Sequence, residues 1–265
     1  MTIREAVAIT RRQFPFTDYI PAEVDRRGAH LNVARTVLRH LAAGATILDF
    51  GCGPCDKTAV VQMLGFRCSG YDDLGDEWHA LPGSREKILS FAQACGIDFR
   101  LATGGKLPFE KNSFDMVMLH DVLEHLHDSP RELLNDLLEL TTPEGLLFAT
   151  VPNAANVRKR LELARGGTNL PRYYDYYWSP GRWRGHVREY VRGDLVRLAE
   201  YLNLDVLEIR ACDHMLTKCP GPIRPAFLAL SGLFAGWKDT WSLVARKMPG
   251  WKPRRGLAEC GSIRA

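Results

Sequence analysis

The sequence predicts an α/β fold with a doubly wound, mostly parallel sheet. From Thr46 onward, short apolar segments alternate with segments of helical spacing, a pattern typical of strand–helix–strand units. The first apolar segment runs directly into the loop Gly51-Cys52-Gly53, and Asp72 follows the second segment, 19 residues after Gly53. Right-handed crossovers put helices on both faces of such a sheet, and ligands bind beyond the carboxyl ends of its strands.

Hydrophobic periodicity predicts the elements in order. An N-terminal cap over residues 1–44 contains a helix predicted from Glu23 to Leu41 and closed by Gly44. The strands that follow are predicted over Ile47–Phe50, Cys68–Tyr71, Asp98–Leu101, Met116–Leu119 and Leu146–Val151. The helices between them are predicted over Lys57–Leu64, Arg85–Cys95 and Pro130–Thr141.

The last part of the chain is less regular. An irregular insert is expected over residues 154–192. A helix over Gly193–Tyr201 and strands over Asp205–Arg210 and Trp241–Arg246 are predicted after it. We expect residues 1–247 to form a single domain, because a chain of this length can bury one α/β core. Residues 19–26 should be loose, and the tail 248–265 should be disordered because it has little apolar surface to bury.

The glycine loop predicts a ligand that lies against the main chain. Glycine adopts backbone conformations barred to other residues, and here Asp49 precedes the loop and Cys52 lies inside it. A dinucleotide needs a third glycine and a free helix N-terminus for its pyrophosphate, but Pro54 and Cys55 occupy that place. A ligand with a ribose, a purine and an amino-acid carboxylate fits better, and S-adenosylmethionine is that ligand.

Asp72 is the predicted ribose-binding residue. Nucleotide-binding units place the acid for the ribose hydroxyls roughly 20 residues after the loop, which matches the position of Asp72. Asp73 is a second candidate for cofactor binding. The alternative is that the two acids only cap the turn that ends at Gly75.

The chain resembles the class I S-adenosylmethionine-dependent methyltransferases of the small-molecule and sugar O-methyltransferase kind, with a type 11 methyltransferase domain. Besides the loop, the matching motifs are Leu107-Pro108-Phe109, Ser113 to Val117, Asp121 to Leu126, Pro143-Glu144-Gly145 and Val151-Pro152-Asn153. The resemblance implies a seven-stranded Rossmann-like sheet with an antiparallel edge strand. The family has an acid for the adenine amine where this chain has Thr103, so Thr103 and Gly104 are expected to contact the adenine through their backbone. His120, after the fourth strand, is expected to face the cofactor.

Asp121, Glu124 and His125 are the main candidates for chemistry. At positions i, i+3 and i+4, their side chains would share one face of a helix that starts at the end of the fourth strand. His125 would take the proton of a substrate hydroxyl, since an imidazole titrates near neutral pH. In a second interpretation the three side chains hold Mg²⁺ or Zn²⁺, because the motif resembles the acid-x-x-acid-His element of ubiquinone-pathway and small-RNA 2′-O-methyltransferases. In a third, Asp121 only caps the helix and the other two pack at the edge of the site.

The insert is expected to bind the methyl acceptor. It interleaves arginines with aromatic residues, and aromatic faces stack on sugars or flat rings while arginines bind phosphate or carboxylate. The predicted acceptor-binding residues are Tyr173, Tyr174, Trp178, Trp183, Arg184 and Arg188. His186, in a segment that resembles the one closing the site in sugar O-methyltransferases, is a candidate second base or fourth metal ligand. The run 223–237 is predicted to be an amphipathic helix that covers the sheet edge, with a dimer contact or a membrane-surface patch as alternatives.

Composition restricts the remaining possibilities. The 265 residues carry a net charge of +4, which is too small for the extended basic face of a nucleic-acid-binding protein. The N-terminus has charged residues in place of the apolar run of a secretory signal, and no stretch is long and apolar enough to span a membrane, so a cytoplasmic location is expected. The seven cysteines are scattered, and the Cys52-x-x-Cys55 pair is interpreted as packing.

The sequence therefore predicts an S-adenosylmethionine-dependent O-methyltransferase. The expected acceptor is a hydroxyl of a sugar, glycolipid or other small metabolite, and the expected oligomeric state is a monomer or homodimer. The alternatives are a metal-assisted 2′-O-methyltransferase of RNA or of a quinone-type phenol, and a catalytically inactive regulatory protein that binds the cofactor.

Overall fold

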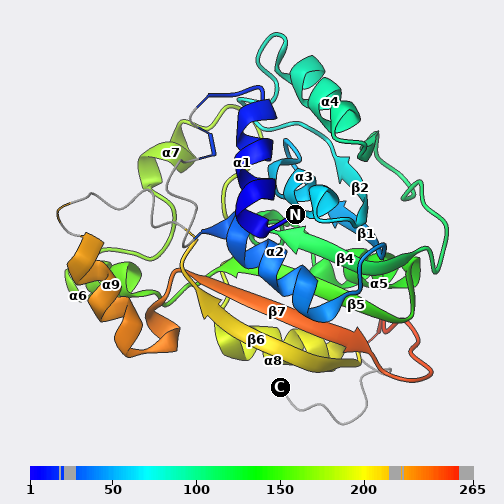
Figure 1. Ribbon diagram of the computed structural model, residues 1–265. Coiled ribbons are helices and arrows are strands. Elements are labelled where there is room, and N and C mark those ends of the chain that lie inside the picture. The colour runs from blue at the N-terminus through cyan, green and yellow to red at the C-terminus, as the bar shows by residue number, and fades with distance from the viewer. Residues whose placement is uncertain (18, 21–27, 215–221, 223, 257–265) are drawn as a thin grey trace. The chain divides into compact units, whose positions relative to one another are not determined.

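The computed structural model describes residues 1–17, 19, 20, 28–214, 222 and 224–256 (Figure 1). Its helices are α1 (Ile3–Gln13), α2 (Ala29–His40), α3 (Asp56–Met63), α4 (Ser84–Ala94), α5 (Pro130–Leu140), α6 (Val157–Ala164), α7 (Tyr173–Tyr177), α8 (Arg192–Tyr201) and α9 (Arg224–Leu233), with short 3₁₀ turns η2 (Leu123–His125) and η5 (Ala235–Trp237). Its strands are β1 (Thr46–Phe50), β2 (Arg67–Asp72), β3 (Asp98–Leu101), β4 (Phe114–His120), β5 (Thr141–Pro152), β6 (Leu204–Cys212) and β7 (Thr240–Lys247).

The strands form one seven-stranded sheet in the order β3-β2-β1-β4-β5-β7-β6. β1 is parallel to β2 and β4, and β2 is parallel to β3. β7 is antiparallel to both β5 and β6. The predicted mostly parallel, doubly wound sheet with an antiparallel strand near its edge is therefore confirmed. The chain order reverses between β1 and β4, which is the place where ligands bind in sheets of this kind.

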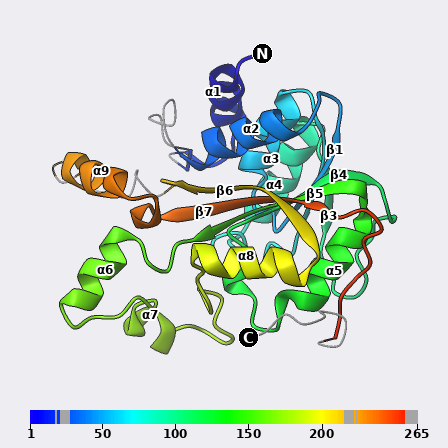
Figure 2. The same cartoon turned by 90° about the horizontal axis from the view of Figure 1, so that it is seen from below.

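The described chain divides into two compact units. The first comprises the described residues within 1–120, 140–142 and 213–219, and the second comprises those within 121–139, 143–212 and 220–265. In the first unit, α1, α2 and α3 pack on one another over a core that includes Val7, Ala34 and Val60 (Figure 1). In the second unit, α8 packs on β6 and β7, and α6 lies beside α9 (Figure 2). A single domain over 1–247 stays a prediction.

Two features of the N-terminal cap differ from the prediction. Helix α1 was not predicted, although the Thr2 side chain accepts from the backbone of Glu5 and the Glu5 side chain accepts from the backbone of Thr2, which is a capping box. The helix predicted from Glu23 is described only over Ala29–His40, and residues 21–27 lie outside the described part of the chain.

The insert 154–192 is more regular than expected, because it contains α6 and α7. The side chain of Asn156 caps α6 by accepting from the backbone N–H of Lys159. A helix is present within the predicted run 223–237, but it is shorter than predicted: α9 ends at Leu233, and extended backbone at Phe234 separates it from η5. Across the described residues, no helix is long and apolar enough to cross a membrane.

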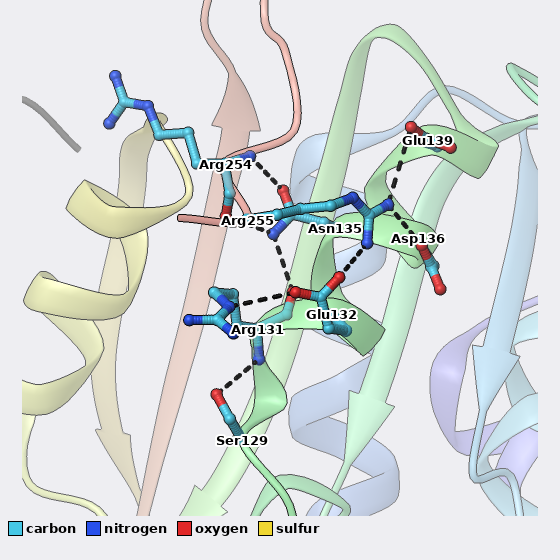
Figure 3. Close-up of polar contacts among 8 residues, drawn as sticks. All are labelled: Ser129, Arg131, Glu132, Asn135, Asp136, Glu139, Arg254 and Arg255. Atoms are coloured by element: carbon cyan, nitrogen blue, oxygen red, sulfur yellow. Dashed lines mark hydrogen bonds and ion pairs between the residues drawn. The ribbon is translucent and has the colours of Figure 1, made fainter. Parts of the chain in front are cut away.

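The prediction of a disordered tail is wrong for residues 248–256. The indole Nε1 of Trp251 donates to the carbonyl of Leu202, and Arg255 forms ion pairs with acidic residues of α5 (Figure 3). Composition alone suggested little to bury, but α5 supplies matching carboxylates and a buried amide, Asn135. Residues 257–265 lie outside the described part of the chain.

Candidate active site

The glycine loop of the first unit follows β1. Gly51, Gly53 and Cys55 all have left-handed backbone, with φ of 71°, 52° and 61°. Glycine adopts this conformation without strain, whereas a residue with a side chain, such as Cys55, adopts it at a steric cost. The Sγ atoms of Cys52 and Cys55 are buried and 3.5 Å apart, so this part of the loop packs into the core.

Asp72 ties the loop to the end of β2. Its carboxylate accepts from the backbone N–H of Gly53 at 2.8 Å and from that of Leu74 at 2.7 Å. Burial raises the pKa of Asp72, while the two backbone hydrogen bonds oppose that rise. Asp73 is exposed and accepts from the backbone N–H of Gly75, which is the turn-capping contact weighed in the sequence. The two acids therefore have different surroundings, and Asp72 is the one that lies against the loop.

Asp49 lies beneath the loop on β1 and is almost completely buried. The hydroxyl of Thr58, on α3, donates to its Oδ2 at 2.6 Å. Burial raises the pKa of Asp49 to about 7, and the hydrogen bond from Thr58 offsets only part of this effect. Its second oxygen, Oδ1, has no hydrogen-bond partner among the described residues.

The other predicted cofactor residues of this unit lie at the same ends of neighbouring strands. The backbone N–H of Ala102 donates to the carbonyl of Asp72, so exposed Thr103 and Gly104 follow directly beside the end of β2. His120 ends β4 and is buried, and burial lowers its pKa well below the usual range. A low pKa keeps this imidazole neutral.

His79 is a residue near the loop that sequence reasoning missed. Its buried ring lies over Gly53, because a Cβ at Gly53 would be 3.6 Å from His79 Cε1. A positive charge on His79 would oppose, to a small extent, the rise that burial causes in the pKa of Asp72. No motif includes His79, and the only signal in the sequence is its neighbour Trp78 within an acidic stretch, so the contact comes from the tertiary fold.

The predicted helix carrying Asp121, Glu124 and His125 on one face is wrong. Asp121 has left-handed backbone, with φ of 58°, and residues 123–125 form the 3₁₀ turn η2. The carboxylate of Asp121 accepts from the hydroxyl of Thr150 and does not cap a helix. Asp tolerates left-handed backbone, so it can turn the chain sharply at the end of β4.

Glu124, His125 and His186 come together in the second unit. Each of the three residues offers one potential metal-ligand atom, and these three atoms lie within 4.8 Å of one another. Asp121 is not part of this group. The Nε2 atoms of His125 and His186 are each 4.0 Å from Glu124 Oε1, and the two rings meet edge to face. Glu124 and His186, 62 positions apart in the chain, are therefore gathered at one place with His125. The roles predicted for His125 and His186 stay predictions.

A short segment after α7 wraps around η2 and brings His186 to Glu124. The backbone N–H groups of Val187 and Arg188 donate to the carbonyl of Glu124 at 2.6 and 3.2 Å. The phenol of Tyr190 donates to the carbonyl of Leu123, and Tyr190 also bridges to Asn153 at the end of β5. This wrapping depends on hydrogen bonds between distant segments, so sequence periodicity does not reveal it.

The hydrogen bonds of both histidines assign the same tautomer. His125 Nδ1 is 2.6 Å from the carbonyl oxygen of Arg184, and His186 Nδ1 is 2.8 Å from Glu189 Oε1. Because a carbonyl and a carboxylate only accept, we assign the ring proton to Nδ1 in each case. Each neutral imidazole then presents the lone pair of Nε2 on the side of Glu124.

Glu124 itself is completely buried, and neither of its oxygens has a hydrogen-bond partner among the described residues. Burial, assisted by the charge of Asp121, raises its pKa to about 9. Without a bound ion, burial therefore favours the neutral form of this carboxyl group. Lys159 and Glu189 form a buried ion pair next to His186, and burial lowers the pKa of Lys159 to about 8. Neither member of this pair was predicted as a site residue.

The predicted acceptor-binding residues have different positions. Arg184 reaches the cluster through its carbonyl oxygen, which accepts from His125. Trp183 reaches it through its indole Nε1, which donates to the carbonyl of His186. Tyr173, Tyr174 and Trp178 are exposed on or just after α7, and Arg188 lies over the ring of Tyr190.

Comparisons with known proteins identify the family of the chain. A family model described as a methyltransferase domain matches residues 24–209. The chain is 31% identical over 143 residues to a ubiquinone biosynthesis O-methyltransferase from Caulobacter vibrioides, covering 52% of this chain and 50% of that protein. It is 36% identical over 103 residues to an uncharacterized methyltransferase from Mycobacterium sp. (strain JLS), covering 39% and 37%. The chain thus spans half or less of the length of these curated relatives.

Solved structures share the fold. A SAM-dependent methyltransferase from Methanosarcina mazei has a TM-score of 0.54 at 15% identity, covering 80% of this chain and 97% of that one. The 1,6-didemethyltoxoflavin-N1-methyltransferase of Burkholderia thailandensis, with bound S-adenosylhomocysteine, has a TM-score of 0.52 at 19% identity, covering 94% and 91%. The family expected from the motifs is thereby confirmed: the chain belongs to the methyltransferase-domain family, with the fold of the class I S-adenosylmethionine-dependent methyltransferases.

Proposed function

We propose that the protein transfers the methyl group of S-adenosylmethionine to a hydroxyl oxygen of a sugar, a glycolipid or another small metabolite. The observation that carries this proposal is the pair of imidazole Nε2 atoms, each 4.0 Å from the buried carboxyl of Glu124. The printed name of the Caulobacter relative, a ubiquinone biosynthesis O-methyltransferase, supports oxygen as the acceptor atom.

The reaction requires alignment and a proton acceptor. The acceptor oxygen attacks the sulfonium methyl in line, so the O–C bond forms as the C–S bond breaks and S-adenosylhomocysteine leaves. The hydroxyl proton moves to Nε2 of His125, with His186 as the second candidate, because both nitrogens hold a lone pair in the assigned tautomer. Trp183 and Arg184 are the proposed acceptor contacts nearest these histidines, since Arg184 contacts His125 and Trp183 contacts the backbone of His186.

Cofactor binding is proposed for the residues around the glycine loop. Asp72 would bind the ribose hydroxyls. Its carboxylate oxygens can each accept a further hydrogen bond in addition to those from the backbone N–H groups of Gly53 and Leu74. The full proposed set is Asp49, Gly51, Cys52, Gly53, Asp72, Asp73, Thr103, Gly104 and His120.

A metal-assisted reaction is the second candidate, because one carboxylate and two imidazoles suit a divalent ion. The orphaned buried oxygens of Glu124 and the Nδ1 contacts of both histidines fit such a site. A bound ion would lower the pKa of an acceptor hydroxyl. We favour the metal-free route, because Asp121, the second carboxylate of the predicted metal-binding set, does not join Glu124 and the two histidines.

The experiment is radiolabelled methyl transfer into a cell extract, with and without a chelator, for the wild type and for His125→Ala, His186→Ala and Glu124→Gln. His40→Ala, at the end of α2, is the matched control. With His125 as the base, activity survives the chelator and falls on the order of 100-fold or more in His125→Ala. Glu124→Gln keeps most activity, because the amide replaces a carboxyl that is already neutral.

The metal-assisted route gives the opposite pattern. The chelator silences the wild type, Mg²⁺ or Zn²⁺ restores it, and Glu124→Gln is as damaging as His125→Ala. Wild-type turnover in both histidine variants would remove the cluster from the mechanism and leave His120 as the base. No methyl transfer into any extract would support the inactive, cofactor-binding alternative.

A further inference from the structure

The second unit exposes an unusual amount of apolar and aromatic surface on α6, α7 and α9. All three helices lie at one end of this unit (Figures 1 and 2). Helix α7 buries none of its residues, and Tyr173 and the following Trp178 are 74% and 67% exposed. Single exposed apolar residues are ordinary in folded proteins, but a helix made of exposed tyrosines is not.

The burial pattern of α9 is inverted. Among its residues with described side chains only Ser231 is buried, whereas Leu233 is 65% exposed and Phe234, directly after the helix, is 57% exposed. Helix α6, beside it, exposes Leu163 at half of its surface. An amphipathic helix normally turns such residues toward the core. Their exposure here indicates that something else covers them.

The charges around these exposed side chains indicate the chemical nature of the surface that covers them. Between Val157 and Arg192, eight arginines are exposed against two exposed carboxylates, Glu162 and Asp175. The segment from Arg224 to Lys238 contains no acidic residue. The covering surface should therefore be anionic. A second copy docking through the same face would bring arginines against arginines, which disfavours that partner.

We propose that the exposed faces of α6, α7 and α9 dock on an anionic lipid surface. Tyrosine and tryptophan favour the headgroup level of a bilayer, and leucine and phenylalanine partition below it. Arginines near the surface add electrostatic attraction to anionic lipids. The docking does not involve the proton-transfer residues, but its face includes Tyr173, Tyr174 and Trp178, which are also predicted to bind the acceptor.

The experiment is flotation of the full chain with vesicles of phosphatidylcholine and phosphatidylglycerol, compared with phosphatidylcholine alone, at low and high salt. Leu233→Ser/Phe234→Ser removes apolar contacts, and Arg165→Gln/Arg172→Gln removes charge. The matched controls on the first unit are Leu81→Ser, which is 57% exposed, and Arg35→Gln on α2. Circular dichroism melting confirms that each variant folds.

The expected result is binding to the anionic vesicles that weakens with salt. Binding should fall about tenfold in Leu233→Ser/Phe234→Ser and about fivefold for each arginine lost, with both controls unchanged. Absence of binding to anionic vesicles, or equal binding by all folded variants, overturns the proposal. A dimer that Leu233→Ser/Phe234→Ser abolishes, without vesicle binding, assigns the face to a second copy and also overturns it.

Discussion

Asp49 shows how one buried carboxyl group makes stability depend on pH. Among the described residues its side chain has one hydrogen-bonding partner, Thr58, and it lies beneath the glycine loop. Burial disfavours its charged form more than one hydrogen bond favours it, and its pKa therefore rises to about 7 from the ordinary value of 3.8. A buried carboxyl group with a raised pKa lowers stability when it ionises. Such groups are common at functional sites, which is consistent with the proposed role of Asp49 in cofactor binding.

Asp49→Asn should stabilise the protein at neutral and higher pH. In the wild type, the folded chain holds a proton that the unfolded chain releases between about pH 4 and pH 7, so stability falls as pH rises through this window. The amide cannot ionise and still accepts from Thr58. We expect a gain of about 2 to 4 kcal/mol at about pH 8 that vanishes near pH 4.

Denaturant unfolding across pH measures this difference. Asp175→Asn, at an exposed position on α7, is the control and should leave the pH profile unchanged. Parallel profiles for the wild type and Asp49→Asn would show that the carboxyl is ionised in the folded protein.

At the scale of elements, the chain after β7 is held against α5. Arg255 bridges Glu132, Asp136 and Glu139, which are spaced along one face of the helix (Figure 3). Buried Asn135 makes a pair of hydrogen bonds with the backbone of Arg254, accepting from its N–H at 2.8 Å and donating to its carbonyl at 2.9 Å. The ion pairs are exposed, whereas the amide contacts are buried.

Asn135→Ala should destabilise the protein more than Arg255→Ala. Removing the buried amide leaves backbone groups of Arg254 and Arg131 without their partner, at a cost of about 2 to 3 kcal/mol. The exposed ion pairs of Arg255 contribute less, and salt should remove that contribution. Denaturant unfolding of both variants at low and high salt distinguishes the contribution of the buried amide from that of the exposed ion pairs. A larger, salt-sensitive loss in Arg255→Ala would mean that the ion pairs hold this segment.

At the scale of the whole molecule, cofactor binding should raise the folding stability. A ligand that binds only the folded state stabilises it by about 2.7 kcal/mol when present at about 100 times its Kd. We expect S-adenosylhomocysteine to raise the melting temperature of the wild type accordingly. Asp72→Ala should weaken its binding by about 1.5 to 3 kcal/mol, because the ribose hydroxyls lose charge-assisted hydrogen bonds.

Scanning calorimetry measures the ligand-induced shift in melting temperature, and isothermal titration calorimetry measures the affinity for S-adenosylhomocysteine. The ligand-induced shift is compared with the unliganded protein of the same variant, since Asp72 also holds the backbone of Gly53 and Leu74. Asp76→Ala is the matched control, because this carboxylate is exposed and lies outside the proposed cofactor-binding set. An unchanged shift in folded Asp72→Ala would reject the ribose assignment.

The sequence determined the fold class and most of the sheet. The predicted strand Asp98–Leu101 matches β3, and the other predicted strands lie within their observed counterparts, because burial of apolar side chains imposes a local period. The glycine loop was also predictable, since glycine adopts the left-handed backbone seen at Gly51 and Gly53 more readily than other residues.

Only the tertiary structure decided which side chains meet. His79 over Gly53, the Lys159–Glu189 ion pair beside His186, and Arg255 on α5 join residues with no common local pattern. The left-handed turn at Asp121 also removed this residue from the cluster that spacing had predicted. Periodicity reports how a segment meets the core, whereas these contacts depend on hydrogen bonds and charges between segments far apart in the chain, and only the packed fold brings those together.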